Sequence, residues 1–195
     1  RVVILATGTV YETLDVPGAQ PSDLVFNEDS AIISYSASRD GERLAGKEVA
    51  VVGGGDAAFE NALILAKHGC KVHLLLRSLP SARRSFVGKV KQRDEITIHP
   101  IPTEIECVEQ RTPDTLRLHL KRGSASEMLD VGGLVIRIGV KPTLPAFETS
   151  PKTDGSGFIH VDDEQCTNIP RLLAAGDVTS RKLRAIVNAA SAGAT

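Results

Sequence analysis

The run of twelve residues at 47–58 constrains the fold more than any other part of the sequence. It reads Lys-Glu-Val-Ala-Val-Val-Gly-Gly-Gly-Asp-Ala-Ala. The apolar stretch Val49–Val52 predicts a strand covered on both faces, the glycines predict a tight turn, and the next residues predict a helix. This order is typical of a βαβ unit that binds a dinucleotide. Gly53 permits the turn, and Gly55 lets the backbone approach a pyrophosphate at the helix N-terminus.

The segments that follow the glycines support this interpretation. Apolar residues recur at helical spacing over 57–68, Gly69 stands where a helix commonly ends, and Val72–Leu76 supplies a second strand. The alternative is a structural turn that binds nothing, because loops without ligands also use glycines for positive φ. The flanking pattern favours a bound dinucleotide. The candidate contacts in the turn are Gly53, Gly54, Gly55, Asp56 and Ala57.

The end of the second strand indicates which dinucleotide binds. An NAD site usually places an acid about twenty residues past the glycines, whereas an NADP site places arginine on the 2′-phosphate. Here the strand runs into Arg77, with no acid nearby, and Arg83 and Arg84 follow within a short loop. Because a guanidinium is always charged and matches phosphate oxygens, these residues favour NADPH. The alternative is an ordinary solvated basic loop.

Composition excludes several classes of function. A formal net charge of −1 and an aromatic content of 4% without tryptophan give no basis for nucleic-acid binding. No apolar run approaches the length of a membrane span, and no secretory signal is visible. The five histidines show no metal-ligand spacing, so no metal is expected. The cysteines lack CxxC spacing and are expected to be free thiols in a reducing, cytoplasmic compartment. They are Cys70, Cys107 and Cys166.

The pattern divides the chain into three parts. Residues 1–45 begin in a buried-type strand and end in a polar link, residues 46–141 form an α/β unit, and residues 142–195 end in a helical pattern. Since domains rarely begin and end inside regular structure, we expect the chain to be a piece of a longer protein.

Four segments, in this order, resemble the thioredoxin reductase branch of the two-dinucleotide-binding flavoproteins. They are Ile4–Gly8, Val51–Ala58, Gly133–Pro142 and Leu173–Val178. The resemblance implies a three-layer Rossmann-like α/β fold with a β-meander, in which an NADPH domain is inserted into a split FAD domain. Residues 46–141 would be the NADPH domain, and residues 1–45 and 142–195 would be partial FAD segments.

The resemblance also implies site residues. On the NADPH side it adds Ile138 and Gly139 to the glycine turn and the arginines. On the FAD side it implies Thr7, Gly8, Gly176, Asp177, Arg184 and Ala185. Asp177 would accept hydrogen bonds from the flavin ribitol, whereas the alternative is a turn or N-cap residue.

One departure from the family pattern changes the expected chemistry. Thioredoxin reductases carry Cys-Ala-Thr-Cys-Asp before the NADPH domain, and this chain reads Ser36-Ala37-Ser38-Arg39-Asp40. Both redox cysteines are replaced, by Ser36 and Arg39, and only the acid, Asp40, is retained. A serine cannot form a disulfide or act as a thiolate, so no catalytic residue is assigned. Ser78 also replaces the second arginine of the family's His-Arg-Arg.

The expected function is a flavoprotein oxidoreductase that passes hydride from NADPH to FAD and then to an external acceptor. A ferredoxin- or flavodoxin-NADP reductase and a non-catalytic nucleotide-binding module remain alternatives. A dehydrogenase without flavin is disfavoured, because no catalytic constellation follows the glycine turn. The expected partners are a small protein or disulfide acceptor and a second copy of the chain in a homodimer, with neither nucleic acid nor membrane.

Overall fold

Two units, each with its own core, make up the chain. One unit is Thr13–Gly139, and the other joins residues 1–12 to residues 140–195. The computed structural model describes residues 2–20, 32–179 and 186–193. Among the described helices, none combines the length and the apolar composition needed to cross a membrane.

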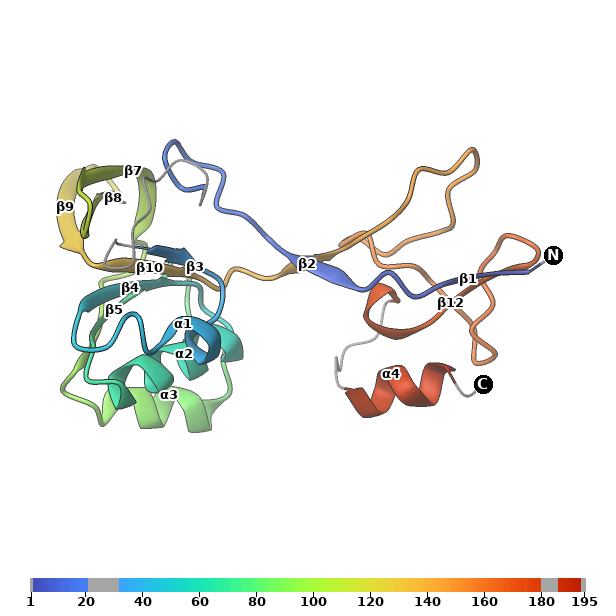
Figure 1. Cartoon of the computed structure of the whole chain (residues 1–195), viewed down its shortest axis with the longest axis horizontal. Helices are drawn as coiled ribbons and strands as arrows, with labels where there is room; N and C mark the ends of the chain where they lie inside the picture. Colours follow the sequence, from blue (N-terminus) through green and yellow to red (C-terminus); the bar gives the residue numbers. More distant parts are fainter. Residues whose placement is uncertain (1, 21–31, 180–185, 194–195) are drawn as a thin grey trace. The chain divides into compact units, whose positions relative to one another are not determined.

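A five-stranded parallel sheet forms the centre of the unit at 13–139 (Figure 1). The strand order is β3-β10-β4-β5-β6, so the strand that ends in the glycine turn, β4, is central. The bounds are Ile32–Ser34 for β3, Gly133–Ile136 for β10, Glu48–Val52 for β4, Lys71–Leu75 for β5 and Ile96–Ile98 for β6.

Different layers cover the two faces of this sheet (Figure 1). Helices α1, α2 and α3 pack on one face, and an antiparallel meander of β7, β8 and β9 covers the other. The helices span Ala37–Asp40, Asp56–Lys67 and Arg84–Lys91. The meander strands span Glu104–Thr112, Thr115–Arg122 and Ala125–Val131. The expected three-layer Rossmann-like fold with a β-meander is therefore confirmed.

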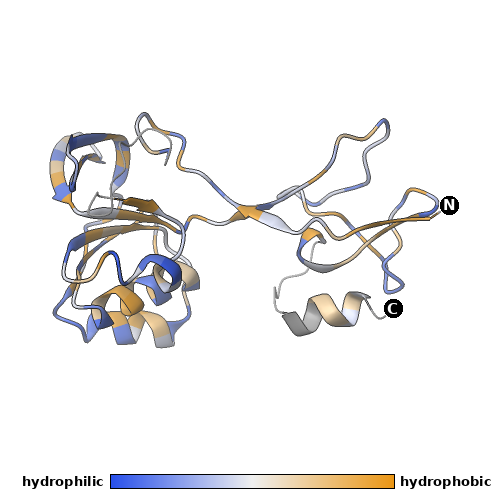
Figure 2. Ribbon diagram, in the orientation of Figure 1, coloured by the Kyte–Doolittle hydropathy of each residue, from blue (hydrophilic) through white to orange (hydrophobic). Residues whose placement is uncertain are grey.

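The alternation of side chains along β4 explains why both faces are covered. Val49 and Val51 belong to the core under the helices, together with the fully buried Phe59 of α2. Ala50, between them, belongs to the core under the meander. Both sets are apolar, so the strand has no face that favours water. Figure 2 shows this apolar character along the strands of the sheet.

The second unit is built on two short strand pairs. Strand β1 (Val3–Leu5) runs parallel to β12 (Leu172–Ala174), and β2 (Thr9–Tyr11) runs antiparallel to β11 (Val140–Pro142). A 3-10 turn, η2 (Gly176–Val178), follows β12, and α4 spans Ile186–Gly193. Its core consists of Leu5, Ile159, Leu172, Ala174 and Val178.

The structure differs in two respects from the organisation expected from sequence. Residues 13–45 share a unit with the glycine turn, because β3 extends its sheet by pairing with β10. The meander has a third strand, β9, that the pattern did not reveal, because most of its side chains are exposed.

A chain of polar side chains ties the sheet to the meander. Arg122 donates to Nδ1 of His99 at 2.6 Å, Nε2 of His99 lies 2.9 Å from Nδ1 of His73, and Nε2 of His73 lies 2.8 Å from Glu48. Since arginine can only donate, His99 must accept at Nδ1 and donate from Nε2, and His73 must then donate to Glu48. A further proton on either ring would set two donors face to face. Arg122 also pairs with Glu127 at 2.8 Å and donates to Thr103.

We expect this network to make the unit less stable in acid. Burial, followed by the charges of His73 and Arg122, lowers the pKa of His99 below the usual value of 6.5 for histidine. The unfolded state then binds the extra proton first, so the free energy of unfolding falls as the pH drops below about 6.5, by at most about 1.4 kcal/mol per pH unit for one proton. Urea unfolding at pH 7.5 and 5.5 measures this slope. His99→Gln should flatten it, and an unchanged slope in this variant would contradict the explanation.

Candidate functional site

Gly53 occupies a position that only glycine fits. Its φ is +138°, and a Cβ there would lie 2.2 Å from the carbonyl oxygen of Arg137. Its amide donates to Leu75 at 3.1 Å. The same Cβ would lie 3.2 Å from that of Ala58, so helix α2 packs close against the turn. The carboxyl ends of β4, β5 and β10 therefore meet here, at the edge where ligands bind in open parallel sheets.

Gly55, the N-cap of α2, leaves the helix end open. Its φ of −90° suits any residue, and the nearest atom to an added Cβ is Ser81 Oγ at 3.8 Å, an ordinary contact. Packing within the protein therefore does not require glycine here, whereas close approach of a ligand would. The N-cap supplies no side-chain acceptor, and the amides of Asp56 and Ala57 have no backbone acceptor in the described part of the chain. Unpaired amides at a helix N-terminus fit a pyrophosphate.

The loop after β5 lies against the glycine turn. The amides of Ser81 and Ala82 donate to the Gly54 carbonyl at 2.9 and 3.1 Å. The Asp56 carboxylate accepts from the Arg83 amide at 2.7 Å and from Arg83 Nε at 2.6 Å. These bonds, the amide first, hold the pKa of Asp56 below its usual value. The turn, predicted from sequence to contact a dinucleotide, thus also positions the basic loop.

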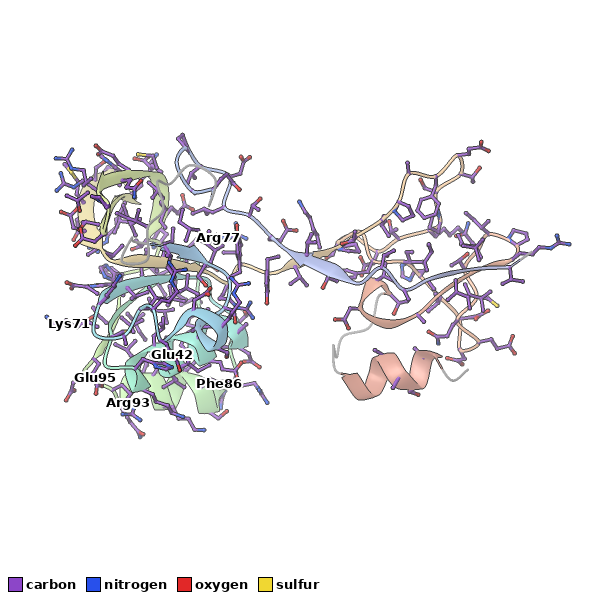
Figure 3. All side chains as sticks on the ribbon, in the orientation of Figure 1. Glu42, Lys71, Arg77, Phe86, Arg93 and Glu95 are labelled. Atoms are coloured by element: carbon purple, nitrogen blue, oxygen red, sulfur yellow. The ribbon has the colours of Figure 1, made fainter. Side chains whose placement is uncertain are left out.

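The other predicted residues of this region lie at the same edge of the sheet. Arg77, labelled in Figure 3, follows β5 and is exposed, as is Arg84 at the start of α3. Ile138 and Gly139 follow β10, directly after Arg137, whose carbonyl lies against Gly53. Both are exposed.

The segment that replaces the family's cysteine pair folds into the short helix α1. Ser36 is its N-cap, and Asp40 accepts hydrogen bonds from Ser34 Oγ at 2.5 Å and from Arg39 at 2.9 Å. Partial burial raises the pKa of Asp40, but the bonds from Arg39 and Ser34 outweigh it and the net pKa is lowered. The retained acid is therefore an ionised acceptor tied to the residue that replaced the second cysteine.

The flavin-side residues gather at the end of a parallel strand pair. Thr7 and Gly8 follow β1, Gly176 and Asp177 follow β12, and pairing of the two strands continues through a bond from the Ala175 amide to Leu5 at 2.9 Å. The half-buried Asp177 carboxylate has no hydrogen-bond partner among the residues that the structure describes. An acceptor-only group of this kind fits the hydroxyls of a polyol. The predicted contacts Arg184 and Ala185 lie outside the described residues.

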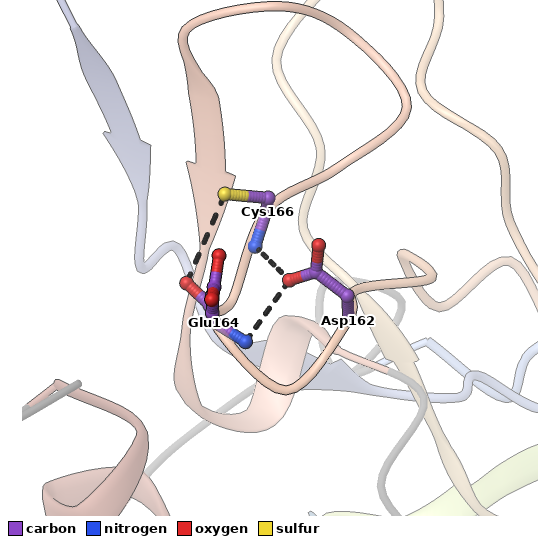
Figure 4. Close-up of side chains that lie close together, drawn as sticks. All are labelled: Asp162, Glu164 and Cys166. Atoms are coloured by element: carbon purple, nitrogen blue, oxygen red, sulfur yellow. Dashed lines mark hydrogen bonds between the residues drawn. The ribbon is translucent and has the colours of Figure 1, made fainter.

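Three further side chains, Asp162, Glu164 and Cys166, lie close together in the loop before β12 (Figure 4). One oxygen of Asp162 accepts from the amides of Glu164 and Cys166 at 3.0 and 2.8 Å. The carboxylate thus closes its own loop, which accounts for the arrangement without a ligand.

Comparison with known proteins decides the family. The model of the pyridine nucleotide-disulphide oxidoreductase family matches residues 1–193. The chain belongs to this family. Among its curated relatives, the thioredoxin reductase of Bacillus subtilis is 33% identical over 201 residues, covering 99% of this chain and 60% of the relative. That of Listeria innocua is 29% identical, covering 99% of this chain and 59% of the relative.

Solved structures agree with this assignment. The thioredoxin reductase of Lactococcus lactis superposes with a TM-score of 0.80 at 26% identity, covering 99% of this chain and 62% of that one. That of T. acidophilum gives 0.75 at 25% identity, covering 98% and 62%. The chain therefore spans about three fifths of the length of the relatives that it matches.

Sequence reasoning missed how the residues of the candidate site contact one another. It did not find the bond between Asp56 and Arg83, the approach of Arg137 to Gly53 or the role of Ser34 as the partner of Asp40. The first and second pairs are 27 and 84 positions apart, and no local pattern indicates such contacts.

Proposed function

We propose that this chain is the nucleotide-binding part of a flavoprotein oxidoreductase that uses NADPH as electron donor and FAD as carrier. The observation that carries the proposal is the convergence of the glycine turn, the open N-terminus of α2 and an arginine-bearing loop at one edge of the parallel sheet. In this arrangement the amides receive the pyrophosphate, and the arginines receive the 2′-phosphate.

The two units take different cofactors in this proposal. The unit at 13–139, which contains nearly all of the expected NADPH domain, binds NADPH, and the unit that joins residues 1–12 to 140–195 contributes to FAD binding through Thr7, Gly8, Gly176 and Asp177. Asp177 holds the ribitol by accepting hydrogen bonds from its hydroxyls. FAD, when bound, would accept the hydride from NADPH and pass the electrons on, whereas the protein binds and orients the cofactors.

The electrons leave for an external acceptor, because Ser36 and Arg39 stand where thioredoxin reductases carry their thiols. A small protein or a disulfide compound is the acceptor class. The protein acts in the cytoplasm as a homodimer, in keeping with the family and with its scattered free cysteines.

A second candidate is transfer to an acidic iron–sulfur protein or flavodoxin. The distribution of ion pairs in the unit at 13–139 favours this second candidate. The meander cations Arg111, Arg117 and Arg122 are in ion pairs. By contrast, several cations on and around α3 have no ion pair with any described residue. They are Arg77, Arg84, Lys89, Lys91 and Arg93. Reduction of ferredoxin in a coupled assay separates this function from disulfide reduction.

Charge reversal at Arg77 tests the choice of donor. If Arg77 contacts the 2′-phosphate, Arg77→Glu should weaken NADPH binding about 10- to 100-fold, since a hydrogen bond to a charged group is worth about 1.5–3 kcal/mol. The affinity for NADH should change little. Fluorescence titration measures both constants, and Arg93→Glu, at a site that Figure 3 shows away from Arg77, is the control for net charge. Unchanged NADPH affinity in Arg77→Glu would contradict the assignment.

A further inference from the structure

Three arginines, Arg77, Arg83 and Arg84, are candidates to bind the 2′-phosphate. Among them, only the side chain of Arg83 is held by contacts with described residues. Its amide and its Nε bond the two oxygens of Asp56 at 2.7 and 2.6 Å. Its guanidinium carbon lies 4.9 Å from the centroid of the Phe86 ring. Arg77 and Arg84 have neither a hydrogen bond nor an ion pair with any residue that the structure describes.

The contacts of Arg83 leave its outer edge available. A guanidinium is planar and carries five N–H donors, and only the Nε donor is used by Asp56. The terminal nitrogens bond no acceptor in the described ranges, and the side chain is 71% exposed. The bond from Nε to Asp56 and the stacking on Phe86 therefore set the direction of the two terminal nitrogens. Two such nitrogens can donate in parallel to two oxygens of a phosphate.

Asp56 is not needed to close the loop, because the bonds from Ser81 and Ala82 to Gly54 already do so. Its lowered pKa keeps it ionised, which puts a negative charge at the start of α2, where a pyrophosphate is expected. That charge opposes the binding of any dinucleotide. The favourable contribution that remains for the Asp56 carboxylate is to orient the Arg83 side chain.

We propose that Asp56 is a positioning residue for cofactor selection, which holds Arg83 so that its terminal nitrogens receive the 2′-phosphate of NADPH. This role rests on the proposed NADPH donor. It requires the favourable effect of Asp56 on the binding of the 2′-phosphate to pass through Arg83. If the bond between Asp56 and Arg83 only stabilised the loop, its loss would change the affinity for nucleotides with and without a 2′-phosphate by the same factor.

Calorimetry on the chain with two probes tests this role. Adenosine 2′,5′-bisphosphate carries the discriminating phosphate, and adenosine 5′-monophosphate lacks it. The ratio of the bisphosphate affinity to the monophosphate affinity cancels the repulsion between Asp56 and the 5′-phosphate that both probes share. Asp56→Asn should lower the ratio about three- to fivefold, which is what an exposed ion pair supplies, and Arg83→Gln about tenfold or more. Glu60→Gln removes an exposed carboxylate one turn further along α2 and should leave the ratio unchanged.

The double variant decides whether Asp56 acts through Arg83. In the Arg83→Gln background, Asp56→Asn should have no further effect on the ratio, because coupled residues are not additive. A wild-type ratio in Asp56→Asn, or an equal loss in both backgrounds, would overturn the inference. A wild-type protein that binds the two probes equally would contradict the NADPH donor itself, and the inference would fall with it.

Discussion

Replacement of Gly53 by alanine is expected to abolish nucleotide binding and to destabilise the unit by about 2–4 kcal/mol. The added methyl group would lie 2.2 Å from the carbonyl oxygen of Arg137, which is backbone and cannot swing aside. Alanine is also strained at a φ of +138°. Relief requires β4 and β10 to separate where their carboxyl ends meet, and this movement displaces the helix amides that receive the pyrophosphate.

Gly88→Ala is the matched control. Gly88 lies inside α3, its φ is not positive, and no atom lies within 4 Å of an added Cβ. The same substitution should therefore stabilise the protein by about 0.5–1 kcal/mol, because alanine loses less backbone entropy in a helix. Urea unfolding and NADPH titration measure both variants. Wild-type NADPH affinity in Gly53→Ala would contradict the assignment of the turn.

The fold was predictable from sequence where the local pattern was strong. The run at 47–58 specified β4, the turn and the start of α2, because strand, glycines and helix follow one another without a gap. Strand β9 was not predictable: four of its first five residues, Ala125–Met128, are exposed, so no alternation marks its buried face. The extension of the sheet by β3 depends on pairing with β10, about one hundred residues away, which no local rule specifies.

The candidate site was predictable as a set of residues but not as an arrangement. The strand–glycine–helix motif and the arginines that follow the second strand supplied these residues, and the structure brings them to one edge of the sheet. The direction of each side chain depends on contacts between distant segments. Asp56 was expected to contact the dinucleotide, which stays a prediction, and its carboxylate bonds Arg83, an exposed residue 27 positions away.

A second large effect is expected in the number of electrons that the protein accepts. A thioredoxin reductase with its thiol pair has an internal disulfide beside the flavin, whereas this chain has Ser36 and Arg39 at those positions. Its three cysteines are free, and burial raises the pKa of Cys70, which keeps that group a thiol rather than a thiolate. None of the cysteines of this chain therefore forms a disulfide that could take a second pair of electrons.

An anaerobic NADPH titration tests the central claim most directly. It is carried out on the protein loaded with FAD. Visible absorbance follows the flavin, and a thiol reagent counts free thiols before and after reduction. The account predicts complete bleaching with about one equivalent of NADPH per flavin and no new thiols. Consumption of a second equivalent with two new thiols would contradict the absence of an internal disulfide, and a flavin that stays oxidised would contradict the reductase and favour a nucleotide-binding module.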